Sequence, residues 1–166
     1  MIVFDTSTLI LTARIDLLHL FASDYRGRML VPDAVEREAC RKGFTAAAAI
    51  RQLIDAGRIE VKRVGVSREL EKLEDDLAID RGEAAAILLA RSERAELVAT
   101  DDRNAIRACR LLGLGFVSTP ALLVRAVEKG IIGKGEGLLK LEKLQAVGRY
   151  RREIIVHAAA AIGEVK

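Results

Sequence analysis

Short apolar runs alternate along the chain with longer segments in which apolar residues recur at helical spacing. The short runs are β-prone and lie at residues 1–4, 29–31, 59–64, 96–100 and 115–118. Helical patterns cover residues 8–21, 33–42, 45–56, 67–78, 82–94, 103–112 and 120–129, and two more run to about residue 146 and from about residue 150. Strands that alternate with helices form right-handed βαβ units, so the pattern predicts an α/β fold with a parallel sheet of about five strands.

The composition is that of one ordinary domain. The 166 residues are 51% apolar, which is enough for a sizeable core. Cys40 and Cys109 have neither disulfide nor zinc-site spacing, and we expect both to be small, reduced hydrophobic residues. Asp5 and Arg14 interrupt the apolar start of the chain, and no apolar run approaches the ~20 residues of a membrane span. We therefore expect a cytoplasmic protein without a signal peptide or a membrane segment.

Acidic side chains follow two of the predicted strands. Asp5 comes directly after the first strand, and Asp101 and Asp102 come directly after the fourth. In an open α/β sheet, ligands gather outside the carboxyl ends of the strands, so these side chains meet in one crevice if the two strands are neighbours. Thr6 or Ser7 would then orient Asp5 or cap the next helix. Asp101 and Asp102 can also serve simply as a helix cap.

Two further acids can likewise be interpreted either as members of the site or as helix caps. One lies in VPDAVEREA, just after the second strand, and the other is Glu83, at the start of a predicted helix. The spacings Asp33-x-x-Glu36 and Asp80-x-x-Glu83 both fit a capping box. A capping box at Asp33 would occupy Glu36 and leave Glu38 available for a site. Thr119 is similarly expected to cap a helix that Pro120 begins.

Several carboxylates in one crevice favour a metal ion. They repel one another and their pKa values rise unless a cation neutralises them. Carboxylate oxygens without His or Cys partners suit the hard cations Mg²⁺ and Mn²⁺. Such an ion can polarise a phosphoryl oxygen and lower the pKa of a bound water, as hydrolysis of a phosphodiester requires.

Four motifs in this order resemble those of the PIN-domain family. They are FDTSTLI, PDAVERE, RGEAAAILLA and LVATDDRNAIRACRLLG, and the resemblance covers roughly residues 1–130. It implies a three-layer α/β/α nuclease domain over residues 1–130, with residues 131–166 as a C-terminal helical extension packed on the same domain. It also implies a Mg²⁺- or Mn²⁺-dependent ribonuclease, in many cases the toxin of a VapBC-type toxin–antitoxin pair, and hence RNA, an antitoxin protein and a second copy of the chain as partners.

The resemblance assigns roles to particular acids. Asp5, supported by Thr6 or Ser7, and Asp102, with Asp101 beside it, would hold the main ion. Glu38 and Glu83 would bind a second ion or orient water. The family often has Leu or Val after its second acid, whereas this chain has Ala39, so Glu36 stays an alternative to Glu38.

Basic residues are concentrated towards the end of the chain. Residues 103–166 carry 12 basic and 5 acidic side chains, whereas residues 1–102 carry 15 basic and 19 acidic ones. Arg103, Arg107 and Arg110 recur on one helical face beside the proposed site and are candidates for RNA phosphates. The segment GRYRRE, residues 148–153, holds a second arginine cluster around a tyrosine, which could grip a strand or contact a partner. A solvated helix face is the alternative for the first cluster, and a surface or partner contact is the more frequent use of a cluster like the second.

Other functions fit the sequence less well. A dehalogenase-like phosphatase needs a second aspartate two residues after the first, where this chain has Ser7. A receiver domain usually has an acidic pair before its phosphorylated aspartate, whereas this chain opens with only one acid. No phosphate-binding loop of the G-x-x-x-x-G-K-[ST] kind is present, which argues against an NTPase. The non-enzymatic alternative is a catalytically idle PIN fold that acts as a binding or assembly module.

Overall fold

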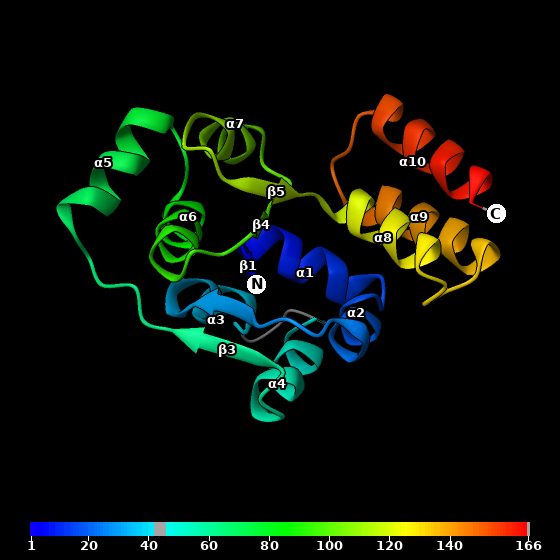
Figure 1. Cartoon of the computed structure of the whole chain (residues 1–166), viewed down its shortest axis with the longest axis horizontal. Coiled ribbons are helices and arrows are strands. Elements are labelled where there is room, and N and C mark those ends of the chain that lie inside the picture. Colours follow the sequence, from blue (N-terminus) through cyan, green and yellow to red (C-terminus); the bar gives the residue numbers. More distant parts are fainter. Residues whose placement is uncertain (42–45, 166) are drawn as a thin grey trace.

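A parallel sheet forms the middle layer of the structure (Figure 1). The computed structural model describes residues 1–41 and 46–165, and within them the sheet has five strands in the order β3-β2-β1-β4-β5. Every neighbouring pair of strands is parallel. The strands are β1 (Ile2–Phe4), β2 (Met29–Pro32), β3 (Ile59–Lys62), β4 (Leu97–Ala99) and β5 (Gly115–Val117). The predicted parallel α/β sheet is therefore confirmed.

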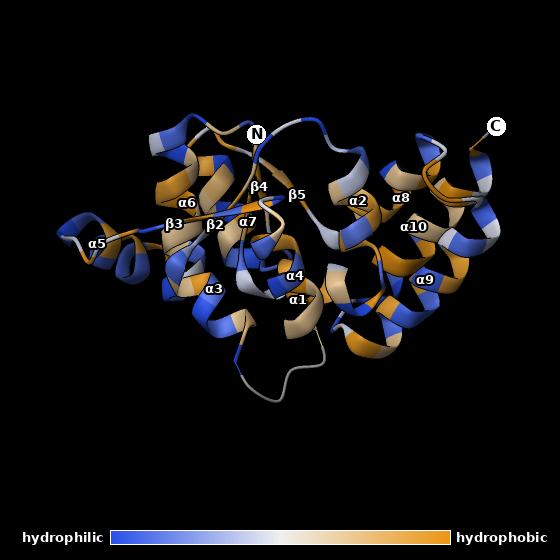
Figure 2. Ribbon diagram, turned by 90° about the horizontal axis from the view of Figure 1, so that it is seen from below, coloured by the Kyte–Doolittle hydropathy of each residue, from blue (hydrophilic) through white to orange (hydrophobic). Residues whose placement is uncertain are grey.

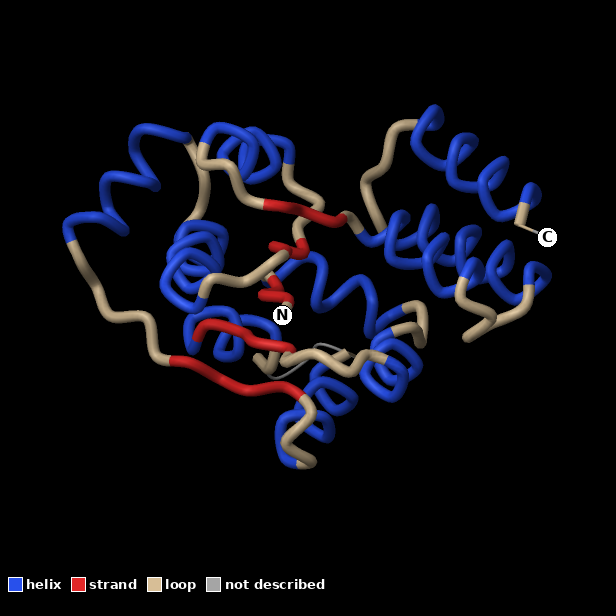
Figure 3. Tube along the Cα trace, viewed as in Figure 1, coloured by secondary structure: helices blue, strands red, loops and turns tan. Residues whose placement is uncertain are grey.

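Helices cover both faces of the sheet (Figures 1 and 3). Successive residues of a strand point to opposite faces, so Ile2 and Phe4 pack in one apolar cluster and Val3 in the other. The first cluster is completed by α1 (Thr6–Arg14), α2 (Leu18–Asp24), α3 (Asp33–Ala39), α4 (Ala47–Asp55), α8 (Thr119–Glu128), α9 (Lys134–Val147) and α10 (Arg152–Glu164). The second is completed by α5 (Arg68–Leu77), α6 (Arg81–Glu93) and α7 (Arg103–Leu111). This is the expected three-layer α/β/α arrangement.

Hydropathy follows the layers. The strands at the centre of the sheet are apolar, whereas α5 is largely hydrophilic and projects at one side of the molecule (Figure 2). Strands buried on both faces need continuous apolar runs, which is why these short runs could be recognised in the sequence. Among the described residues, none of the helices has the length and apolar character needed to cross a membrane.

The single helix predicted over residues 8–21 is wrong. The chain forms α1 and α2 instead, and between them Asp16 adopts a left-handed backbone conformation with φ of 55°. Aspartate tolerates this region better than most residues. Contacts from α9 stabilise this break in the helix. Lys140 donates to the carbonyl oxygens of Ile15 and Asp16, and Lys143 forms an ion pair with the Asp16 carboxylate at 2.6 Å.

The helix that begins at Asp33 also differs from its prediction. It ends at Ala39 with Cys40 as its cap, and the predicted end at Lys42 lies outside the described residues. The predicted capping box is absent, because Asp33 is already the first helical residue. Its carboxylate instead accepts a hydrogen bond from the Val64 backbone at 3.0 Å and pairs with Arg37.

The C-terminal helices pack directly on the rest of the chain. α8, α9 and α10 contact one another, and α9 also contacts α1. Gly137 of α9 is buried, and a Cβ atom at this position would lie 2.5 Å from Cγ2 of Val127 on α8. Only glycine therefore permits this close approach of α9 to α8. The division of the chain at residue 130 stays a prediction.

Two glycines of α9 test this packing. We expect Gly137→Ala to lower the free energy of unfolding by about 1–2 kcal/mol, because the β-branched Val127 cannot easily move away from the added methyl group. Gly135→Ala in the same helix is the matched control, since nothing lies within 4 Å of its added Cβ. It should raise the free energy of unfolding by about 0.5–1 kcal/mol through helix propensity. Urea unfolding measures both, and equal effects of the two variants would contradict the packing.

Candidate functional site

The carboxyl ends of β1 and β4 meet where the connections of the sheet change direction. β2 and β3 extend the sheet from one side of β1, whereas β4 and β5 extend it from the other. Phe4 pairs with Ala99, and the Asp5 backbone N–H donates to the Ala99 carbonyl oxygen at 3.0 Å. Asp5 and the segment 100–102 therefore leave the sheet side by side, at the position where open α/β sheets bind ligands.

Asp5 is a buried carboxylate. It is 1% exposed and caps α1, since its Oδ1 accepts from the Thr8 backbone N–H at 2.8 Å. The Ser7 hydroxyl lies 3.1 Å and 3.2 Å from its two oxygens. Burial raises the pKa of Asp5 to about 6, and the charge of Asp101 adds to this rise, although hydrogen bonds from Thr100 and Thr8 oppose it.

Asp101 holds neighbouring elements together. Its Oδ1 accepts from the Thr119 backbone N–H at 3.0 Å, and its Oδ2 accepts from the hydroxyls of Thr119 and Thr8. Thr119 is therefore not the helix cap that its position suggested. Ser118 caps α8 instead, and Thr119 is its first residue. Asp101 thus links the end of β4 to the starts of α1 and α8.

Asp102 caps α7 with only one of its oxygens. Its Oδ1 accepts from the backbone N–H groups of Asn104 and Ala105, at 2.7 Å and 2.9 Å. Its Oδ2 accepts no hydrogen bond from the described residues. The capping role anticipated for this aspartate is therefore real, and it leaves one carboxylate oxygen available to a ligand.

Glu83 combines the capping box with a strongly shifted pKa. The box with Asp80 is present, with both of its hydrogen bonds at 2.8 Å. Burial raises the pKa of Glu83 to about 7, and the charges of Asp80, Asp102 and Asp5 contribute to the rise. The electrostatic influence of Asp102 and Asp5 places Glu83 in the same acidic group.

Glu38 is linked to the acidic group by the hydroxyl of Thr6, the residue after Asp5. Thr6 donates to Glu38 Oε2 at 2.9 Å, and a Cβ atom added to Gly82 would lie 3.7 Å from the same oxygen. α6 therefore passes close to this pair at Gly82. Glu36 acts elsewhere, because its charge raises the pKa of Cys40, an effect secondary to burial of that thiol. The geometry therefore favours Glu38 over Glu36 as a member of the acidic group.

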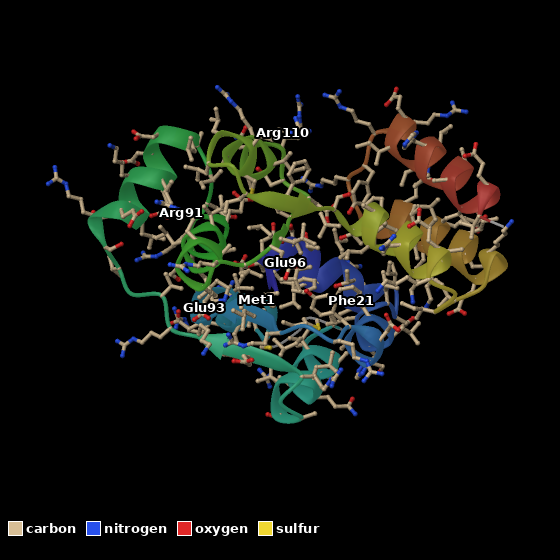
Figure 4. All side chains as sticks on the ribbon, in the orientation of Figure 1. Met1, Phe21, Arg91, Glu93, Glu96 and Arg110 are labelled. Atoms are coloured by element: carbon tan, nitrogen blue, oxygen red, sulfur yellow. The ribbon has the colours of Figure 1, made fainter. Side chains whose placement is uncertain are left out.

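A pocket of about 860 Å³ opens beside this acidic group, although neither Asp5 nor Glu38 lines it. Glu83, Asp101 and Asp102 line it, and so does Arg103 at the start of α7. Arg107 and Arg110 are exposed farther along this helix, and neither lines the pocket (Figure 4 shows Arg110). Arg110 lies over the ring of Phe116, 5.1 Å from its centroid. The three arginines therefore have different surroundings.

The remaining wall of the pocket was not predicted. It is formed by residues 147–151, which connect α9 to α10 and lie more than 130 positions from Asp5 in the sequence. The arginine cluster of this segment was visible in the sequence. Its proximity to the acids depends on how α9 packs, which the sequence pattern does not reveal.

The chemistry of the acids fits a hard cation. Glu38, Glu83 and Asp102 each use one oxygen in hydrogen bonds to the protein, while the second accepts none from the described residues. No group of three or more His, Cys, Asp or Glu in those residues is already gathered around one ion position.

The fold and this pocket define an α/β protein with an acidic site at the switch point of a parallel sheet. A family model described as a PIN domain matches residues 1–164. The chain belongs to the PIN-domain family. PIN domains are generally nucleases and typically use divalent metals, so the fold is of a nuclease type. Searches of curated proteins and of solved structures gave no match.

The raised pKa values predict how stability depends on pH. In a metal-free buffer, the protonated forms of Asp5 and Glu83 are favoured by folding. Their contribution to stability is fully present below their unfolded pKa values and is lost as the pH rises through about 6 and about 7. We therefore expect the free energy of unfolding to fall between pH 5 and pH 8, with Asp5 accounting for about 1–1.5 kcal/mol of that fall.

Chemical unfolding in EDTA at several pH values measures this effect. Asp5→Asn can still cap α1, and it should flatten the pH profile and be more stable than wild type at pH 8. Asp75→Asn is the control, because it changes an exposed acid on α5 that does not line the pocket. A wild-type stability that rises steadily from pH 5 to pH 8 would contradict the assignment.

Proposed function

We propose that the protein is a metal-dependent endoribonuclease that hydrolyses RNA phosphodiester bonds. The observation that carries the proposal is the pairing of β1 with β4, which brings the buried Asp5 beside Asp101 and Asp102. The raised pKa values of Asp5 and Glu83 support it, because burial, and to a smaller extent repulsion from neighbouring carboxylates, makes their charged forms unfavourable, and a divalent cation would relieve both effects.

Each acid has a distinct proposed role. Asp5 and Asp102 would hold the main Mg²⁺ or Mn²⁺ ion, while Asp101 fixes their position through its contacts with Thr8 and Thr119. The ion would supply charge stabilisation at the phosphoryl group and a more acidic water. Glu38 and Glu83 would bind a second ion or orient the attacking water.

Glu83 is also suited to move a proton. A general base works best when its pKa lies near the operating pH, and the pKa of Glu83 is about 7. Its Oε1 accepts no hydrogen bond from the described residues and can receive the proton of the attacking water. Ser7 would keep Asp5 oriented, and Thr6 would do the same for Glu38. Histidine is not required for this chemistry.

RNA is the substrate that the charges favour. Arg103 lines the pocket, and Arg107 and Arg110 extend a basic surface along α7. Each phosphate contact made by such a residue adds electrostatic affinity that salt weakens. Cys40 and Cys109 are both free and buried, which suits the reducing cytoplasm, where we place the activity.

We further propose that the protein is the toxin of a VapBC-type pair, with an antitoxin protein that occludes the acidic pocket and with a homodimeric toxin. The family and the acidic pocket support this proposal. A neighbouring gene for a small DNA-binding protein that binds this chain and inhibits cleavage would support the toxin role. A bound partner that leaves cleavage unaffected would count against it.

Metal binding and cleavage together test the nuclease proposal. Calorimetry should detect Mn²⁺ binding to wild type, and Mn²⁺ should stimulate cleavage of a single-stranded RNA. Asp5→Asn should remove both, because it takes one negative charge out of the buried site, whereas Asp75→Asn should retain both. A folded wild-type protein without metal-stimulated cleavage would favour the alternative, a catalytically idle PIN fold that acts as a binding or assembly module.

A second experiment decides between the two glutamates of α3. We expect Glu38→Gln to reduce the cleavage rate by about 10–100-fold, the range typical of residues that orient a metal site. Glu36→Gln, two positions away, should retain nearly the full rate because Thr6 donates to Glu38 and not to Glu36, whose charge instead acts on Cys40. Initial rates at saturating Mn²⁺ give the comparison, and the reverse ranking would assign the role to Glu36.

A further inference from the structure

The acidic pocket has one wall that does not come from the strand ends. On one side lie Glu83, Asp101 and Asp102, and on the other lies the segment 147–151 between α9 and α10. We call this segment the α9–α10 linker. It passes beside the junction of β5 and α8 before α10 begins (Figure 1). The pocket is therefore incomplete without the C-terminal helices.

The path of α9 determines how the linker reaches the acids. Lys140 contacts Ile15 and Asp16 at the end of α1, whereas Val147 lines the pocket together with Ile10 and Ser7, nearer the start of α1. α9 thus runs antiparallel to α1. Because Asp5 caps the start of α1, this direction brings the end of α9 back to the catalytic end of the sheet.

Tyr150 fixes the linker against the acids. Burial raises the pKa of Tyr150 well above its ordinary value, and the neighbouring Asp101 charge raises it further. The hydroxyl therefore stays neutral. Its oxygen is buried without a hydrogen-bond partner among the described residues. The hydroxyl lies close to Thr119 and Asp101 but forms no hydrogen bond of good geometry with them, and the ring packs against the first apolar cluster, so we assign the anchoring of the linker to the ring.

The two arginines beside Tyr150 are available to a ligand. Arg149 and Arg151 are exposed and line the pocket, as does Arg103 from the opposite side. Within residues 1–41 and 46–165, none of the three forms an ion pair, although three carboxylates line the same pocket. An RNA strand that approaches these carboxylates meets repulsion, which cations at the pocket rim can offset. Arg152 follows directly but does not line the pocket.

We propose that the α9–α10 linker is a substrate-binding element, in which Arg149 and Arg151 bind RNA backbone phosphates and Tyr150 positions them. This inference rests on the proposed nuclease function and assigns to the C-terminal helices a part in its binding site. Arg103 binds the strand from the other side of the pocket, so the acids lie between two sets of phosphate contacts.

RNA binding measured under conditions that prevent cleavage tests the role of Arg149 and Arg151. Fluorescence anisotropy in EDTA measures the Kd of a labelled single-stranded RNA at several salt concentrations. Arg149→Ala with Arg151→Ala should weaken binding and reduce the slope of log K against log salt by about 0.7 for each lost contact. Arg152→Ala is the matched control, since it removes the same charge next to the pocket, and it should keep the wild-type slope and a Kd within about twofold.

Several outcomes would overturn the proposal. They are an unchanged Kd in the double variant, an equal loss in Arg152→Ala, and a wild-type protein that does not bind RNA. RNA binding that depends on Arg149 and Arg151 in a protein that fails to cleave would refute the nuclease function alone. Cleavage with unchanged KM in the double variant would refute the linker alone.

Tyr150 needs a separate comparison. Tyr150→Phe keeps the ring and should retain the wild-type Kd, because the hydroxyl is close to Thr119 and Asp101 but forms no hydrogen bond of good geometry with them. Tyr150→Ala should raise KM and Kd while kcat changes little, since it displaces the two arginines but leaves the acids in place. Thermal unfolding checks that each variant is folded. If Tyr150→Phe weakens binding as much as Tyr150→Ala, the ring does not position the linker.

Discussion

The parallel pairing of β1 with β4 is the constraint on which the site depends. Both strands are only three residues long, and Phe4 opposite Ala99 is the last pair of their shared ladder. One residue farther along, the chain has Asp5 on one side and the segment 100–102 on the other. Helices begin immediately after both. Since parallel strands end at the same edge of a sheet, pairing these two strands suffices to gather their acids.

The acids serve the fold and the site together, and the two roles do not compete. A carboxylate has two oxygens, and Asp102 and Glu83 each commit one of them to backbone N–H groups at the start of a helix. These N–H groups carry partial positive charge, which reduces the repulsion among the carboxylates. Asp5 still has a pKa of about 6 and Glu83 one of about 7, chiefly because both are buried and to a smaller extent because neighbouring carboxylates repel them. The remaining unfavourable charge is what a divalent cation would neutralise.

Local sequence was sufficient for the strands and for the acids that follow them, because a short, continuous apolar run that stops at an aspartate is typical of a buried strand. The order of the strands could not be deduced in this way. The sequence supported only a conditional statement, namely that the acids meet if β1 and β4 are neighbours. The failures arise from tertiary contacts. Asp16 breaks a good helical pattern because lysines of α9 hold its backbone and carboxylate. Thr119 has the position of a helix cap, yet Asp101 accepts hydrogen bonds from both its backbone N–H and its hydroxyl.

The same tertiary contacts connect the C-terminal helices to the acids. The nine-residue helix α1 begins next to Asp5, and Lys140 of α9 binds the carbonyl oxygen of Ile15 at its other end. α1 therefore connects the contact with α9 to the site. Gly137 allows α9 to approach α8, and α9 in turn delivers the linker to the pocket. The close packing of α9 is therefore a requirement of the proposed binding site as well as of stability. A chain that kept every acid but lost this packing would retain the proposed metal ligands and lose the arginines at the rim of the pocket.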